Sequence, residues 1–234
     1  VNVMGGAAGE ADPALFKDSL TKLVEAIAET EENLMEKYFA EESLSADEMQ
    51  PALRAAINAG QVFPVLACAG AKEIGIEELL DAIITLAPSS ADRGAVAVAE
   101  GEPLQPQASL PAAARVFKTV TDPFVGQITY FRVYQGTVSS GTDVQNVTRG
   151  HKERLGDLLI IQGKEQIKVD KATPGDIVAV AKLKDTRVND TLGTAAVSFV
   201  PIQFPRPVLT LAVQSAKQGD EEKLAEGLHR VANE

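Results

Sequence analysis

Basic side chains gather in one short stretch of the second half of the sequence. Four side chains of this kind fall within six residues: Arg149, His151, Lys152 and Arg154. Arginine and lysine at the tip of a hairpin can neutralise nucleic-acid phosphates, and each contact adds affinity that depends on salt but not on base sequence. Acidic residues at positions 153 and 157 interleave with these charges. On charge alone, a phosphate-binding hairpin and a solvated hairpin fit the pattern equally well.

A second basic group follows some thirty positions later and consists of Lys182, Lys184 and Arg187.

The motifs of the common enzyme classes are missing. There is no Gly-x-x-x-x-Gly-Lys-Ser/Thr phosphate loop, no Gly-x-Gly-x-x-Gly motif after a strand and no Gly-x-Ser-x-Gly nucleophile elbow. The sequence motifs therefore give no reason to predict an enzyme activity for this chain.

Cysteine and histidine are too scarce for a nucleophilic or metal site. Cys68 is the only cysteine, so no internal disulfide can form. His151 and His229 are the only imidazoles, and neither follows a metal-ligand spacing. We interpret Cys68 as a small buried residue at the end of a strand. No catalytic residue and no metal ligand is predicted.

The composition is that of an ordinary folded protein. The chain has 234 residues, 45% of them hydrophobic and 24% charged. No apolar run reaches the roughly 20 residues that cross a bilayer, and the first residues lack the basic and apolar regions of a signal peptide. We expect a cytoplasmic protein with no membrane partner.

The net charge of −11 is unevenly distributed. Residues 1–100 hold 6 basic and 18 acidic side chains, a net charge of −12. Residues 101–202 hold 12 basic and 10 acidic side chains, a net charge of +2, and residues 203–234 carry −1. Because net charge bears on association rather than on fold, an acidic part joined to a mildly basic part indicates domains with different partners.

The first part of the chain has a helical pattern. Apolar residues recur at spacings of three, four and seven over residues 13–38, which predicts one amphipathic helix. Ser45 and Glu48 have the spacing of a capping box for a second helix, which would end at Gly60. Pro51 does not fit, because it lies beyond the first turn of that helix. The second helix therefore either starts later or bends at Pro51.

A single strand pattern follows these helices. Residues 62–67 form an apolar run of strand length, the small residues at 68–72 turn away from it, and helical spacing resumes over 76–86. Strand, loop and helix make half of a βαβ unit, which belongs to a parallel sheet with more strands. Since only this strand is convincing, we predict that residues 1–88 are the end of a larger α/β domain.

The second half of the sequence has the pattern of β-strands. Prolines, a Ser-Ser pair and many alanines predict a linker over residues 89–112. Short β-rich runs separated by glycine-containing turns then indicate a small closed barrel over residues 113–203. Residues 204–234 predict one strand, 208–213, and one helix beginning at Asp220, the start of a further truncated domain. The β runs of the predicted barrel are 115–120, 127–134, 142–147, 167–169 and 177–181.

Several short strings occur in a fixed order along the chain. They are Leu-Met-Glu-Lys-Tyr at 34–38, Pro-Val-Leu at 64–66, Thr-Asp-Pro-Phe-Val-Gly at 121–126, Arg-Val-Tyr-Gln-Gly-Thr from 132, Lys-Glu-Arg from 152 and Pro-Gly-Asp-Ile from 174. Together they closely resemble bacterial translation elongation factor G and its paralogues. The resemblance covers nearly all of the chain, from late in the G domain through the second domain into the start of the third.

The resemblance implies a fold of mixed α and β class. It comprises an α/β remnant of a Ras-like G domain, an all-β translation-factor barrel, and the first strand and helix of a ferredoxin-like third domain. It also implies a parent that is a GTPase using GTP and Mg²⁺. The family's phosphate loop, switch regions and Asn-Lys-x-Asp motif lie upstream of this chain, so we expect no cofactor and no activity in the fragment itself.

One nucleotide-contacting segment of the family falls within the chain. It is the loop after the Pro-Val-Leu strand, where the family has Ser-Ala and a larger residue, and where this sequence has Ala69, Gly70 and Ala71. The missing serine hydroxyl removes a side-chain hydrogen bond, although a backbone N–H can still meet the guanine carbonyl. This degenerate guanine loop indicates a divergent paralogue.

The family's second domain contacts the small ribosomal subunit, so the resemblance favours ribosomal RNA as the partner of Arg149, His151, Lys152 and Arg154. We expect a monomer whose parent acts in translocation or recycling. Two alternatives stay open: a ribosomal protection factor of the tetracycline-resistance type, and a scaffold paralogue that has lost GTPase activity. The segment 121–126 is interpreted as a turn between barrel strands or as a contact to the switch regions.

Overall fold

The structure is a computed structural model that describes residues 13–41, 44–122 and 125–232. The chain divides into two compact units, Val1–Arg93 and Gly94–Glu234, and each is described here by itself. The predicted turn at Pro123 and Phe124 lies outside the described residues. Across the described ranges, none of the helices combines the length and apolar character needed to cross a membrane.

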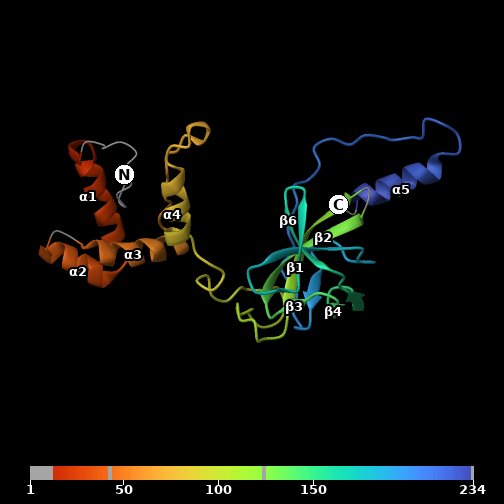
Figure 1. Cartoon of the computed structure of the whole chain (residues 1–234), viewed down its shortest axis with the longest axis horizontal. Coiled ribbons are helices and arrows are strands. Elements are labelled where there is room, and N and C mark those ends of the chain that lie inside the picture. The colour runs from red at the N-terminus through yellow and green to blue at the C-terminus, as the bar shows by residue number, and fades with distance from the viewer. Residues whose placement is uncertain (1–12, 42–43, 123–124, 233–234) are drawn as a thin grey trace. The chain divides into compact units, whose positions relative to one another are not determined.

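The first unit is helical. It contains α1 (Pro13–Ala28), α2 (Glu32–Glu41), α3 (Ala46–Asn58), a short 3₁₀ turn η1 (Gly70–Lys72) and α4 (Ile76–Leu86), as Figure 1 shows. The prediction of one helix over 13–38 is wrong, because the chain turns between α1 and α2. At that turn the Thr30 hydroxyl donates to the Ile27 carbonyl oxygen at 2.6 Å, replacing helical hydrogen bonding with a local one.

The predicted capping box at the start of α3 is confirmed. The Ser45 amide and hydroxyl both donate to Glu48 Oε2, at 3.0 and 2.6 Å. Lys37 of α2 donates to the other oxygen of the same carboxylate at 2.6 Å, which joins the two helices. Pro51 lies inside α3, which begins at Ala46 and continues past the proline. The helix therefore starts where the capping box places it, and Gly60 follows its end with a φ of +73°.

Residues 62–67 do not form the predicted strand. Phe63 and Val65 are 78% and 93% exposed, and the first bridge of this region joins Ala69 to Ile74. A strand needs a neighbour for its backbone groups, and the described part of the chain supplies none to this segment. The interpretation of Cys68 as buried is also wrong, because its side chain is exposed.

The second unit is built on an antiparallel β-barrel (Figure 1). One eight-stranded sheet has the order β5-β4-β10-β1-β2-β9-β6-β7, and β3 pairs with β8. The mixed fold class that the sequence predicts is confirmed: helices precede a large antiparallel barrel. The strands are β1 (Ala113–Asp122), β2 (Gly126–Gln135), β3 (Val138–Ser139), β4 (Asp143–Asn146), β5 (His151–Arg154), β6 (Leu158–Gln162), β7 (Glu165–Val169), β8 (Lys171–Ala172), β9 (Ile177–Ala181) and β10 (Thr191–Gly193).

Alternation along the strands fills the barrel interior. In β2, Phe131 and Val133 are fully buried, while Tyr130, Arg132 and Tyr134 point to the other face. The inward side chains meet those of β1, β4, β6, β9 and β10 in one hydrophobic cluster. Their burial removes apolar surface from water, which is the main force holding the strands together.

The segment before the barrel is more ordered than a linker. Val96 and Leu104 exchange backbone hydrogen bonds of 2.8 and 2.9 Å. Leu104 is 1% exposed and packs in a second cluster with Val197 and Phe199. Part of the predicted linker at 89–112 therefore covers one side of the barrel.

The chain after the barrel shows one of its two predicted elements. The predicted strand at 208–213 is not formed, and Val208 is fully exposed. The predicted helix is present as α5 (Glu221–Ala232), which has no buried residue among those described. As with residues 62–67, an apolar segment here lies without a partner strand in the part of the chain that the structure describes.

Candidate nucleic-acid interface

The predicted basic stretch lies on the hairpin of β4 and β5. The two strands pair in register from Asp143 opposite Arg154 to Asn146 opposite His151. The turn between them closes with a hydrogen bond of 2.8 Å from the Gly150 amide to the Asn146 carbonyl oxygen. The hairpin brings all four predicted residues together, but their side chains have different surroundings.

Arg149 is paired with carboxylates of a neighbouring loop. Its Nε donates to Asp190 Oδ2 at 2.6 Å, and its Nη1 lies 3.7 Å from Asp185 Oδ1. The Asp190 side chain is 4% exposed and also accepts from Asn146 Nδ2 at 2.9 Å. The guanidinium charge is therefore neutralised by a buried carboxylate. Arg149 fixes the hairpin to the loop that contains Asp190.

His151 is close to a second buried carboxylate. Its Nε2 lies 3.2 Å from Oε1 of Glu153, whose side chain is 3% exposed. Glu153 also accepts from the amides of Asp185 at 2.9 Å and Lys184 at 3.3 Å, and from the Thr186 hydroxyl at 3.1 Å. Burial alone raises the pKa of the Glu153 carboxyl, but hydrogen bonds from these amides, from His151 and from Thr186 outweigh it, so the pKa is lowered.

Lys152 and Arg154 lie on the outer face of β5. Both are exposed, whereas Glu153 between them is buried, as strand alternation requires. Arg154 makes an ion pair with Asp143 at 3.4 Å, in which the side chains are 74% and 59% exposed. Lys152 makes no ion pair with any residue that the structure describes. These two side chains are the members of the predicted set that are available to an external phosphate.

The second basic group lies on the loop that Glu153 and Asp190 hold. Lys182 and Lys184 are exposed there, and Arg187 Nη2 lies 3.7 Å from Asp185 Oδ1. Two buried carboxylates thus cross-link this loop to the β4–β5 hairpin. The cross-link fixes the position of this loop next to the hairpin.

The predicted guanine loop, Ala69, Gly70 and Ala71, is a tight turn. The Ala69 amide donates to the Ile74 carbonyl oxygen at 2.9 Å, and the Lys72 amide donates to the Ala69 carbonyl oxygen at the same distance. Within the described residues, the amides of Gly70 and Ala71 donate to no acceptor. These two amides are therefore available to an external acceptor.

Comparison with known proteins identifies the barrel. The family model described as elongation factor G domain 2 matches residues 111–195. Residues 111–195 are thus similar to the second domain of elongation factor G. It is also similar to a crystal structure of a protein from Thermus thermophilus, with a TM-score of 0.76 and 29% sequence identity. That match covers 97% of this chain and 33% of the other, so the chain spans about a third of the length of the Thermus protein.

The barrel carries a second basic surface, which was not predicted from the sequence. Arg115 lies on β1, and Arg132 and Tyr134 lie on β2. The alternation over 130–134, in which aromatic or basic residues take every second position, was the available signal. It places these side chains on the outer face, away from the barrel core.

Proposed function

We propose that this chain is the ribosome-docking part of a ribosome-dependent translational GTPase, and that its barrel binds small-subunit ribosomal RNA as a monomer. The match of residues 111–195 to elongation factor G domain 2 carries this proposal. The exposed side chains of Lys152 and Arg154 support it, because they are basic neighbours on the outer face of β5. Such a surface recognises phosphates without reading bases.

The charge distribution favours a local contact over attraction by the whole molecule. The chain carries a net charge of −11, and residues 1–100 carry −12. An acidic protein is repelled by RNA at long range, so binding must come from short contacts that release counterions. Affinity for RNA should therefore fall steeply as the salt concentration rises.

The parent protein, in this proposal, uses GTP with Mg²⁺ in translocation or recycling. The 234 residues hold no phosphate-loop motif, so the chain alone should not turn over GTP. The Ala69-Gly70-Ala71 loop favours one second candidate, a scaffold paralogue without GTPase activity. Its side chains offer no hydrogen bond to guanine, which leaves only two backbone amides for base recognition.

The docking proposal is tested by sedimenting the chain with purified bacterial small and large ribosomal subunits at low salt. We expect the chain to pellet with small subunits at least about tenfold more tightly than with large ones, since non-specific phosphate binding alone would not distinguish them. Equal binding to both subunits, or binding to neither, contradicts the proposal. GTP turnover by the chain that survives repurification contradicts the assignment of no hydrolytic activity.

A further inference from the structure

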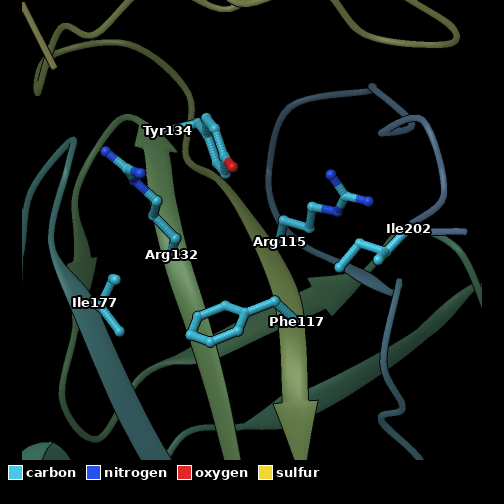
Figure 2. A pocket seen from close by; sticks show the side chains of 6 residues that line it. All are labelled: Arg115, Phe117, Arg132, Tyr134, Ile177 and Ile202. Atoms are coloured by element: carbon cyan, nitrogen blue, oxygen red, sulfur yellow. The ribbon is translucent and has the colours of Figure 1, made fainter. Parts of the chain in front are cut away.

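We propose that the outer face of β1 and β2 binds a single nucleotide, with its phosphate on two arginines and its base against aromatic rings. The face contains a pocket of about 220 Å³. Figure 2 shows Arg132 and Arg115 on opposite sides of this pocket, with Tyr134 and Phe117 at its two ends. The pocket is lined by Arg115, Phe117, Arg132, Tyr134, Ile177 and Ile202.

The two arginines of the pocket repel each other, and a bound anion would reduce this repulsion. Arg115 and Arg132 are register partners, directly opposite each other on neighbouring strands. Like charges in that position repel and destabilise a sheet. The pocket lining contains no carboxylate, and neither arginine makes an ion pair within the described part of the chain. Local conflicts of this kind are expected where a site serves binding rather than folding.

The arginines differ from the other basic groups of the barrel in this respect. Arg149 and Arg154 both lie against carboxylates, at 2.6 and 3.4 Å. Arg115 instead donates to neutral acceptors, the Val200 carbonyl oxygen at 2.6 Å and Asn189 Oδ1 at 3.3 Å. Its buried Nε has no acceptor among the described residues. The positive charge of this face is therefore left for an external anion.

Aromatic rings make a nucleotide a better fit than a simple anion. The Arg132 guanidinium lies 5.6 Å from the centre of the Tyr134 ring, and the Lys118 ammonium lies 5.8 Å from the centre of the Tyr130 ring. Interleaved cations and aromatic rings on the exposed face of a sheet are a means by which proteins bind single-stranded nucleic acid. A carboxylate-bearing peptide would use the arginines but would have no need of the rings.

The size of the pocket limits the ligand to one nucleotide. Pockets for drug-sized ligands usually hold about 300–1,000 Å³, so 220 Å³ accommodates one base with its phosphate. The unit can come from a free nucleotide or from one unstacked position of an RNA strand. Neither source requires the β4–β5 hairpin, so this inference stands independently of ribosome docking.

The test is a binding titration of the full chain with AMP, adenosine, inorganic phosphate, a single-stranded oligoadenylate of six residues and an acidic hexapeptide. We expect AMP or the oligoadenylate to bind at least tenfold more tightly than adenosine, phosphate or the peptide. A free nucleotide as the source predicts equal affinity per site for AMP and the oligomer, whereas an RNA strand predicts tighter binding of the oligomer.

Two variants assign the binding to the pocket. Arg132→Gln should lower affinity about tenfold without lowering the melting temperature, because it also removes the repulsion from Arg115. Tyr134→Leu should weaken the binding of AMP but leave the weak affinity for phosphate unchanged. Lys164→Gln, on the β6–β7 turn, is the matched control. Tightest binding of the peptide, unchanged AMP binding in both pocket variants, or no binding of any nucleotide probe would overturn the inference.

Discussion

The Arg149 guanidinium and the buried Asp190 carboxylate lie 2.6 Å apart, from Nε to Oδ2. This ion pair joins the β4–β5 hairpin to the loop that carries Lys182 and Lys184. An arginine that a basic sequence cluster presents as an RNA contact thus pairs with a buried carboxylate and joins two segments of the barrel. The distinction between positioning and contacting residues gives separate predictions for stability and for binding.

Arg149→Ala should destabilise the barrel by about 2 kcal/mol, because it leaves a buried carboxylate without its charge partner. Arg154→Ala is the matched control, since its ion pair is exposed and should cost less than about 0.5 kcal/mol. Urea unfolding followed by tyrosine fluorescence measures both, as two of the three tyrosines lie on β2. Equal destabilisation by the two variants would show that Arg149 has no special structural role.

The hydrogen bonds to Glu153 predict a pH dependence. Its pKa is lowered in the folded state, so its contribution to stability is present above its ordinary pKa of 4.5 and is lost as the pH falls through the lowered value. Glu153→Gln carries no charge at any pH. The stability advantage of the natural chain over Glu153→Gln should therefore be largest near neutral pH and shrink on acidification below pH 4.5. An advantage that stays constant or grows on acidification contradicts the assignment.

Glu48 should titrate well below an ordinary glutamate. Hydrogen bonds from Lys37 and from the Ser45 side chain and amide lower its pKa to about 2. Carboxyl NMR titration of the full chain measures this value directly. Lys37→Met should move the pKa upward while the capping box to Ser45 remains, because the hydrogen bond from Lys37 is the largest cause of the shift. A Glu48 pKa near 4.5 in the natural chain would contradict the contact between α2 and α3.

Two glycines with the same backbone conformation should differ in their tolerance of alanine. Gly136 and Gly141 have φ values of +72° and +71°, which strain any other residue. A Cβ at Gly136 would lie 2.5 Å from the Leu110 carbonyl oxygen, whereas one at Gly141 would meet nothing within 4 Å. Thermal unfolding should show a cost of about 1 kcal/mol for Gly141→Ala and about 3 kcal/mol for Gly136→Ala. Equal costs would show that the approach of the 110–112 segment to Gly136 does not matter.

The sequence predicted strands with a clear β composition, and it missed β5, which depends on a distant loop. β1, β2 and β9 were predicted because β-branched and aromatic residues mark them. β5 was missed because its sequence, His-Lys-Glu-Arg, is charged, and only the amides of the 184–186 loop make the inward Glu153 acceptable. The reverse error occurred at 62–67 and 208–213, where strand-like residues lack a neighbouring strand in the described chain.

The sequence located the candidate site, but it could not distinguish the residues that position the site from those that are free to bind a ligand. Arg149 and Lys152 are equivalent in a count of charges. Asp190, 41 residues away, forms an ion pair with Arg149, and local spacing gives no sign of that contact. The sequence also did not predict that Arg115 and Arg132 lie opposite each other, because this depends on the register between β1 and β2.

The salt dependence of binding to bacterial small ribosomal subunits tests the central claim most directly. Phosphate contacts make log affinity fall linearly with log salt, by about 0.7 to 0.9 per contact. The double variant Lys152→Ala and Arg154→Ala should bind more weakly and with a slope shallower by about 1.5, while Lys164→Ala with Lys171→Ala should retain the natural slope. An unchanged slope in the Lys152 and Arg154 variant would contradict the assignment of this surface to ribosomal RNA.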